Sequence, residues 1–412
     1  MTAEQLVLLI FSVTYLGIAL GGVPGLALDR TGIALLGAIA LVAGGLVSTP
    51  AAIASVDAST ILLLYGLMVL SAQFRVGGFY TRLARGIVSR LRSPEEFLLW
   101  LMAASAGLSA LLANDIVCLA FAPVVTVSAA RAGLNPIPFL LALAMSSNIG
   151  SAATIIGNPQ NMLIGQAGAL NFGRFLTWCA PPSLISLAIA YGLLRTAYRG
   201  RWHQTGIRID ESAYTLPPYN RWQSGKALFL TGVLVFLFLF TRVPREAAAI
   251  AVAGILLCSR RITTRTLLDL VDWHLITLFV SLFIVTGSLS LYGLQDRAME
   301  ALHRRGVDLN DPIVLAPTTL VLSNLFSNVP AVFLLLKNLD LSHPETLYLL
   351  ALVSTYAGNL IPVGSIANLI TIEQAGRLGV RIGFREYARL GVPVCLATVA
   401  IAVLWHGLVR LL

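Results

Sequence analysis

Uncharged hydrogen-bonding side chains gather in two stretches of an otherwise apolar chain. The first runs from Met145 to Gly168 and the second from Ser354 to Gly376. Glycine and proline interrupt both stretches, so the backbone there would lose helical hydrogen bonds and must be buried in protein or line a wet cavity. Amides and hydroxyls in such a break can bind a polar solute or an ion. A broken apolar span of this kind indicates the midplane binding site of a transporter.

A polar motif precedes each broken span, at Ala113-Asn114-Asp115 and at Ser327-Asn328-Val329. Half-helix N-termini favour an anion or polar oxygens, and unwound carbonyls favour a cation. Any one of these amides and hydroxyls could instead cap a helix end. The predicted substrate-binding or ion-binding residues are Asn114, Asp115, Ser147, Asn148, Thr154, Gly157, Asn158, Asn161, Ser327, Asn328, Asn359, Gly364, Ser365 and Asn368.

Asp115 is the one acidic residue placed at a hairpin tip or at a break, since Glu373 follows the second break, and Val329 stands at the counterpart position of Asp115. An ionisable group at membrane depth is a functional candidate by default, so we expect Asp115 to carry the coupling proton. The alternative is that its charge favours the N-terminus of a hairpin helix. Cys118 lies one turn further on, where a thiol could bind a soft metalloid, although most membrane cysteines are small apolar side chains. The five histidines show no metal spacing, and no metal or cofactor is predicted.

The motifs repeat in the same order, which indicates an internal duplication. A shift of 207 residues places Ser147 on Ser354, Gly157 on Gly364 and Asn161 on Asn368. The upstream asparagines, Asn114 and Asn328, are 214 residues apart.

Composition sets the class of protein. The 412 residues are 57% hydrophobic and 11% charged, whereas soluble domains carry about 25% charged residues. The net charge of +9 is spread between apolar spans, so nucleic-acid binding is excluded. The four cysteines show no zinc or disulfide framework. The chain is therefore an integral membrane protein, and the lipid bilayer is its main partner.

Spans of about 20 apolar residues define two repeats. The first repeat is predicted at 1–195, with spans near 5–23, 31–49, 59–79 and 174–195, a re-entrant hairpin at 96–130 and a broken helix at 137–169. A linker at 196–225 follows. The second repeat is predicted at 226–412, with spans near 226–242, 246–258, 274–294 and 391–411, a hairpin at 313–342 and a broken helix at 346–376. Five crossings and one hairpin per half predict an all-α fold of two inverted repeats with broken helices at the midplane.

Basic residues orient this fold. With both termini outside, the inside loops hold 20 of the 28 Lys and Arg residues and the outside regions hold 8. Because positive charge belongs on the cytoplasmic side, the linker 196–225 is predicted to be cytoplasmic. The N-terminal sequence is read as a first span and not as a cleaved signal peptide. We expect a multi-pass protein of the cell inner membrane.

The motifs resemble the ion transporter superfamily, which includes arsenite permeases, citrate and dicarboxylate carriers and sodium/proton antiporters. Ala113-Asn114-Asp115, Ser327-Asn328-Val329-Pro330 and Pro362-Val363-Gly364-Ser365 resemble arsenite permease elements, whereas Asn148 to Ile164 is more similar to the P-protein and anion-permease branch. Arsenite permeases carry an acidic residue and a lysine just before the Pro-Ile-Gly-Ser element, where this chain has Gly358 to Ile361. The resemblance covers nearly the whole chain and implies transport and the inverted-repeat fold.

The predicted function is proton-coupled export of arsenite or antimonite, since neutral As(OH)₃ fits uncharged donors and acceptors. The alternatives are a sodium-coupled or proton-coupled importer of dicarboxylate, citrate or sulfate, a sodium/proton antiporter, and a passive channel driven by an ATPase subunit. A homodimer is a further expectation. The chain has no nucleotide-binding GxxxxGK[ST] sequence of its own. No constellation for catalysis is present, so an enzyme is not predicted.

Overall fold

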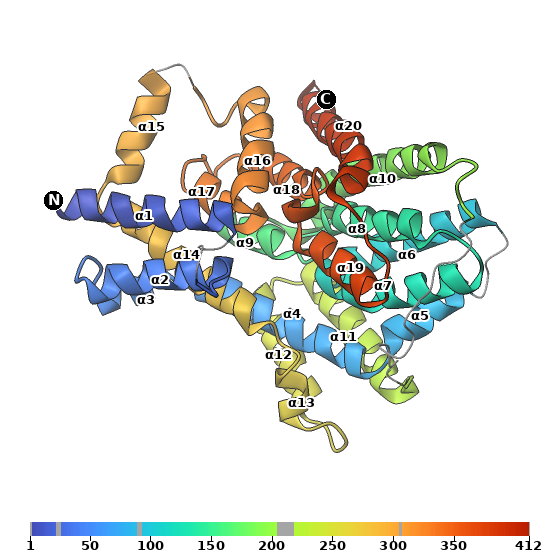
Figure 1. The fold of residues 1–412 in the computed structure, drawn as a ribbon. Helices are drawn as coiled ribbons and strands as arrows, with labels where there is room; N and C mark the ends of the chain where they lie inside the picture. Colours follow the sequence, from blue (N-terminus) through green and yellow to red (C-terminus); the bar gives the residue numbers. More distant parts are fainter. Residues whose placement is uncertain (1, 22–25, 89–92, 204–217, 305–306, 412) are drawn as a thin grey trace.

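The computed structural model describes residues 2–21, 26–88, 93–203, 218–304 and 307–411, and this part of the chain is helical without a β-strand (Figure 1). Seven of its helices are long and apolar enough to cross a membrane. The first half contains α1 (Ala3–Leu20), α2 (Arg30–Ala43), α3 (Thr49–Ser55), α4 (Ala58–Val76), α5 (Phe79–Val88), α6 (Pro94–Leu111), α7 (Asn114–Arg131), α8 (Pro136–Ser151), α9 (Pro159–Ala167) and α10 (Phe172–Ala197). The second half contains α11 (Arg221–Phe240), α12 (Arg245–Leu257), α13 (Thr264–Leu268), α14 (Trp273–Leu291), α15 (Leu294–Arg304), α16 (Pro312–Phe326), α17 (Asn328–Leu336), α18 (Pro344–Ala357), the 3₁₀ turn η2 (Pro362–Gly364), α19 (Ile366–Arg377) and α20 (Phe384–Leu411).

Corresponding helices of the two halves exchange partners. α2 packs against α14 while α4 packs against α12, so the second span of each half lies against the third span of the other. α6 packs on α8 as α16 packs on α18, and the last spans, α10 and α20, pack against each other. This reciprocal pattern is what a two-fold relation between repeats produces. The predicted fold class, an all-α polytopic membrane protein with two inverted repeats, is confirmed.

The predicted hairpins and broken helices are present as pairs of helices. The first hairpin is α6 and α7, which meet at Leu112-Ala113, and the second is α16 and α17, which meet at Ser327. The first broken helix is α8 and α9, and the second is α18 and α19. Both breaks end at an N-cap residue, Asn158 or Ser365, whose side chain accepts a backbone hydrogen bond from the next helix. The sequence therefore stops and restarts each helix with ordinary capping chemistry.

Four short helices were not predicted from the sequence: α3, α5, α13 and α15. Each follows a span, and α5 lies mostly in the stretch between the span near 59–79 and the hairpin at 96–130, for which the sequence predicts no element. α11 begins at Arg221, inside the predicted linker 196–225, of which residues 204–217 lie outside the described part of the chain. The division into domains at these boundaries stays a prediction.

Gly150 allows α8 to approach α6 closely, which holds the first broken helix against its hairpin. A Cβ at Gly150 would lie 2.3 Å from both the Cα and the carbonyl oxygen of Ala106. We expect Gly150→Val to destabilise the protein by about 3 kcal/mol or more, because a helix backbone cannot move aside cheaply. Thermal unfolding in detergent measures this loss. Gly107→Val, at an open position beside Ala106 on the same helix, is the control, and equal melting temperatures for the two variants would contradict the packing argument.

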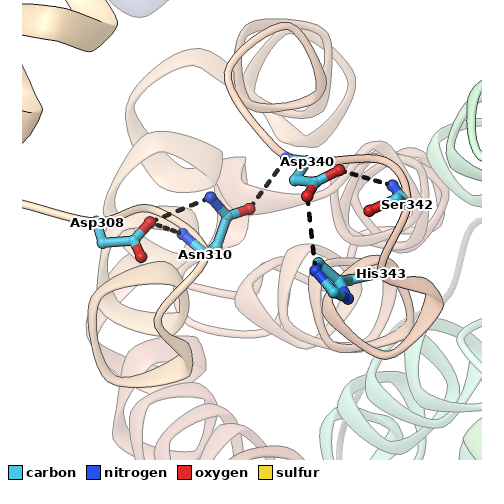
Figure 2. A network of polar contacts seen from close by, with 5 residues as sticks. All are labelled: Asp308, Asn310, Asp340, Ser342 and His343. Carbon is cyan, nitrogen blue, oxygen red and sulfur yellow. Dashed lines mark hydrogen bonds and ion pairs between the residues drawn. The ribbon is translucent and has the colours of Figure 1, made fainter.

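A polar network closes the base of the second hairpin, outside the membrane spans (Figure 2). Asn310 donates from its backbone and side-chain nitrogens to Asp308 Oδ1 at 2.9 and 3.1 Å. Its Oδ1 accepts from the Asp340 backbone N–H at 3.0 Å. Asp340 Oδ1 in turn accepts from the Ser342 N–H at 2.9 Å, and Asp340 Oδ2 lies 3.5 Å from His343 Nε2. The network joins the loop before α16 to the loop after α17.

Hydrogen bonds from the backbone and side chain of Ser342 lower the pKa of Asp340 from its usual value, and His343 adds to the effect. A lowered folded-state pKa means that this contribution to stability is present above the unfolded pKa and is lost as pH falls through the folded pKa. We therefore expect the loop 338–343 to open in acid, below about pH 4. Hydrogen exchange of the Ser342 amide as a function of pH measures this opening. In Asp340→Asn the acid-dependent step should be missing, and its persistence would assign the step to another group.

Candidate substrate and ion site

Asn148, near the end of α8, is the centre of a buried hydrogen-bond cluster. Its Nδ2 donates to Asn359 Oδ1 at 2.8 Å and to Asn368 Oδ1 at 3.1 Å. Its Oδ1 accepts from Asn114 Nδ2 at 3.0 Å and from Ser365 Oγ at 3.0 Å. One amide therefore connects the tip of the first hairpin, the first broken helix and the second broken helix. Four predicted site residues therefore bond to Asn148, which is itself a predicted site residue.

Asn161 and Asn368 occupy equivalent positions and make equivalent bonds. Asn161 Nδ2 donates to the carbonyls of Ser151 at 3.3 Å and Thr154 at 2.9 Å. Asn368 Nδ2 donates to the carbonyls of Gly358 at 2.7 Å and Ile361 at 3.3 Å. Both pairs of carbonyls are related by the same 207-residue shift as the asparagines. Each amide thus satisfies the carbonyls that its own broken helix leaves free.

Glycine lets the chain fold back on itself at each break. A Cβ at Gly157 would lie 2.2 Å from the Ser151 carbonyl oxygen, and one at Gly364 would lie 2.9 Å from that of Gly358. Asn158 caps α9 by accepting from the Asn161 N–H at 2.9 Å, and Ser365 caps α19 by accepting from the Ala367 N–H at 3.2 Å. Asn158 and Ser365 therefore cap helices, and the two glycines allow the close backbone approach at each break.

The second hairpin tip joins the second break. With its amide oriented to suit its neighbours, Asn328 donates to the Ser354 carbonyl at 3.1 Å and the Gly364 carbonyl at 3.3 Å. Ser327 has φ 78°, a left-handed conformation that is uncommon for a residue other than glycine. Such backbone strain is often found at functional sites. Gly364 precedes Ser365, whose hydroxyl donates to Asn148, so the second hairpin tip is linked through this segment to the first hairpin.

Hydroxyl groups tie the first hairpin to the first broken helix. Ser147 Oγ donates to the Asn114 carbonyl at 3.1 Å and pairs with Ser109 Oγ at 2.6 Å. Thr154 Oγ1 donates to the Ala110 carbonyl near the end of α6. The structure therefore brings all the predicted site residues to one region, and all except Asp115 and Ser327 are buried.

Asp115 lies in the first turn of α7 and is partly buried. The α7 N-terminus has no side-chain cap, so the carboxylate is not used as one. Within the described residues Asp115 has neither a hydrogen bond nor an ion pair. Cys118, one turn further, is fully buried, and no three metal-ligating side chains gather anywhere in the described chain.

Thr355 belongs to this cluster but is missing from the predicted set. Its Oγ1 accepts from Asn158 Nδ2 at 3.2 Å and from Gln160 Nε2 at 3.4 Å. The shift of 207 residues places Asn148 on Thr355, so each half uses the same position to reach the break of the other half. A threonine within an apolar helix carries little signal, and the repeat offset alone could have identified it.

Comparisons with known proteins extend over the same elements. A family model described as "CitMHS: Citrate transporter" matches residues 6–348. The chain belongs to this family. The CitMHS family lies within the ion transporter superfamily, so the resemblance read from the motifs is confirmed.

Relatives of this CitMHS family member match over most of their length. The silicon efflux transporter LSI3 of Oryza sativa is 28% identical, covering 95% of each chain. The putative transporter arsB of Dictyostelium discoideum is 24% identical, covering 92% of this chain and 87% of its own. The crystal structure of the Alcanivorax borkumensis YdaH transporter superposes with a TM-score of 0.60 at 13% identity, covering 98% of both chains. The first two support a transporter, and the third shows the fold.

Proposed function

We propose that this CitMHS family member exports arsenite or antimonite from the cell in exchange for protons. The observation that carries the proposal is the charge of the converging segments. Residues 112–115, 148–161, 326–330 and 357–368 contain a single ionisable side chain, Asp115. The site is otherwise built from amides, hydroxyls and backbone groups, which suit a neutral hydroxide such as As(OH)₃.

Unused hydrogen-bonding atoms fit such a solute. Asn359 Nδ2, Asn114 Oδ1 and Asn161 Oδ1 are buried without a protein partner. A buried amide group left unpaired costs about 1–3 kcal/mol, so these atoms favour a ligand that both donates and accepts hydrogen bonds. The hydroxyl groups of arsenite do both. The relative named as a silicon efflux transporter points the same way, since silicon also forms a neutral hydroxide in water.

Protons are favoured over sodium as the coupling ion. Carbonyl oxygens at a broken helix are the usual ligands for sodium. Here Asn161 and Asn368 donate to the carbonyls at the first and second breaks. These amide donors already use one acceptor position on each of four carbonyls, which leaves those carbonyls less available to a cation. Asp115, by contrast, is a carboxylate without a hydrogen-bonding partner, and it can take up and release a proton.

The second candidate function is transport of an anion such as citrate, which the description of the family favours. The N-termini of α9 and α19 begin at the two breaks and could hold a carboxylate by their free N–H groups. No lysine or arginine lies within the four converging segments to balance a second or third carboxylate. This makes a tricarboxylate a poorer fit than a neutral solute.

The proposed cycle moves the hairpins and broken helices as a unit past the other spans. Protonation of Asp115 from the outside and release to the cytoplasm would bias which face is open. The distribution of 20 basic residues inside and 8 outside supports external termini and a cytoplasmic 196–225 loop, and we propose this orientation in the cell inner membrane. Inverting the protein would reverse that bias.

Purified protein in liposomes tests the proposal. A pH gradient or a sodium gradient is imposed, and uptake of arsenite, antimonite, citrate and succinate is followed. We expect arsenite and antimonite to accumulate against their gradients when a pH gradient is present, and not with sodium alone. Arsenite movement that ignores the pH gradient would contradict proton exchange. Citrate accumulation without arsenite accumulation would establish the anion transporter instead.

A further inference from the structure

A basic pocket lies where α11 begins and α12 ends, and it shares no lining residue with the candidate substrate site. Its volume is about 660 Å³, and it is lined by Trp222, Gln223, Lys226, Ile255, Arg260 and Arg261 among others. Three of these side chains are cationic, and no carboxylate contributes to the lining. The pocket therefore attracts an anion.

The two arginines are available to bind it. Lys226 Nζ donates to the Ile255 carbonyl at 2.8 Å, which places it at the end of α12. Ser259 Oγ accepts from the backbone N–H groups of Arg261 and Ile262, which fixes the turn that carries both arginines. Neither guanidinium group has a hydrogen bond or an ion pair within the part of the chain that the structure describes. Arginine matches the geometry of phosphate oxygens with its paired N–H donors.

The surroundings of the pocket select a lipid. Trp222 is 72% exposed and stands at the end of a membrane span, the position that tryptophan favours at the membrane–water boundary. Ile255 on α12 is 51% exposed and Phe229 on α11 is 70% exposed, which gives both helices apolar surface toward the bilayer. A ligand with a phosphate beside the arginines and acyl chains along this surface would fit both the basic pocket and the apolar surface next to it.

We propose that this pocket binds the headgroup of an anionic phospholipid. Basic pockets between membrane helices on the cytoplasmic side commonly recognise such headgroups, and the arginines lie on the side predicted to be cytoplasmic. The site is independent of which solute the protein carries, since none of its residues belongs to the candidate substrate site.

The bound lipid would stabilise the junction of three helices. Gln223 lines the pocket and its Oε1 accepts from Gln73 Nε2 on α4 at 2.5 Å. The neighbouring Ser224 Oγ donates to the Gly77 carbonyl at the end of α4 at 3.0 Å. A headgroup that bridges α11 and α12 therefore also braces α4, against which both helices pack.

Lipid binding is tested on the purified full chain in detergent. The melting temperature is measured with added phosphatidylglycerol, phosphatidylcholine or inorganic phosphate, and retained lipid is counted by native mass spectrometry. We expect phosphatidylglycerol to raise the melting temperature and to be retained, and the other two to have no effect. Loss of both charges in R260Q/R261Q should weaken phosphatidylglycerol binding by about 30-fold.

The matched control is R381Q/R385Q, which removes the same charge from two exposed arginines on the side predicted to be cytoplasmic. It should bind phosphatidylglycerol as the unmodified protein does. Trp222→Ala serves as a second variant that keeps every charge and should also weaken retention. Equal retention by R260Q/R261Q and the control would overturn the proposal, as would stabilisation by inorganic phosphate equal to that by phosphatidylglycerol.

Discussion

Replacing Asn148 with leucine is expected to abolish transport and to lower stability sharply. Leucine cannot accept from Asn114 and Ser365 or donate to Asn359 and Asn368, the four partners of this amide. Each buried group left unpaired costs about 1–3 kcal/mol, so a total loss of about 3 kcal/mol or more is expected. The first hairpin would also lose its direct link to the second break.

A conservative variant separates stability from function. Asn148→Thr places at this position the residue that the second half carries at Thr355, whose hydroxyl accepts from two amides. It should still accept from Asn114 and Ser365, and we expect it to fold while transporting more slowly. Melting temperature and arsenite flux in liposomes are measured for both variants. Wild-type flux in Asn148→Leu would show that the cluster has no part in transport.

Asp115→Asn should uncouple solute movement from the pH gradient. Asparagine keeps the size of the side chain but cannot carry a proton, so accumulation driven by a pH gradient should fall to the level of empty liposomes. Exchange of arsenite for arsenite at equal pH on both sides needs no net proton movement and should persist. The pair of assays therefore separates a coupling residue from one that only supports the fold.

Glu373→Gln is the matched control for this variant. Glu373 lies on α19 after the second break, where it is exposed and paired with Arg377 at 2.6 Å. A surface pair of this kind contributes little, and pH-driven accumulation should be unchanged. If Asp115→Asn accumulates arsenite as the unmodified protein does, the coupling proton is carried elsewhere.

The hairpins and broken helices could be predicted from the sequence because lipid imposes a strict rule on the backbone. A bare main chain is unfavourable in hydrocarbon, so Gly157, Pro159 and the asparagines around them had to mark a buried break. The repeat offset then related one half to the other. What the sequence left open was the role of each amide, since a cap and a ligand use the same residue types.

Other features carried no comparable signal. Thr355 is a threonine in an apolar helix, and its importance arises from Asn158 and Gln160, which reach it from the other half of the chain. α5 and α15 pack against the spans that precede them, and the sequence alone did not distinguish them from loops. The role of Thr355 and the formation of α5 and α15 depend on tertiary packing, which the local periodicity of the sequence does not reveal.

Because spans of one half pack on spans of the other, part of the first half has no packing partner until the second half has been synthesised. Gly66 on α4 packs so closely on Ala249 of α12 that an added Cβ would lie 2.6 Å from its backbone carbonyl carbon. The ribosome completes α4 long before it makes α12, so the newborn first half must wait in the bilayer with that face uncovered. We expect insertion machinery or lipid to cover this face of α4 until the later spans arrive.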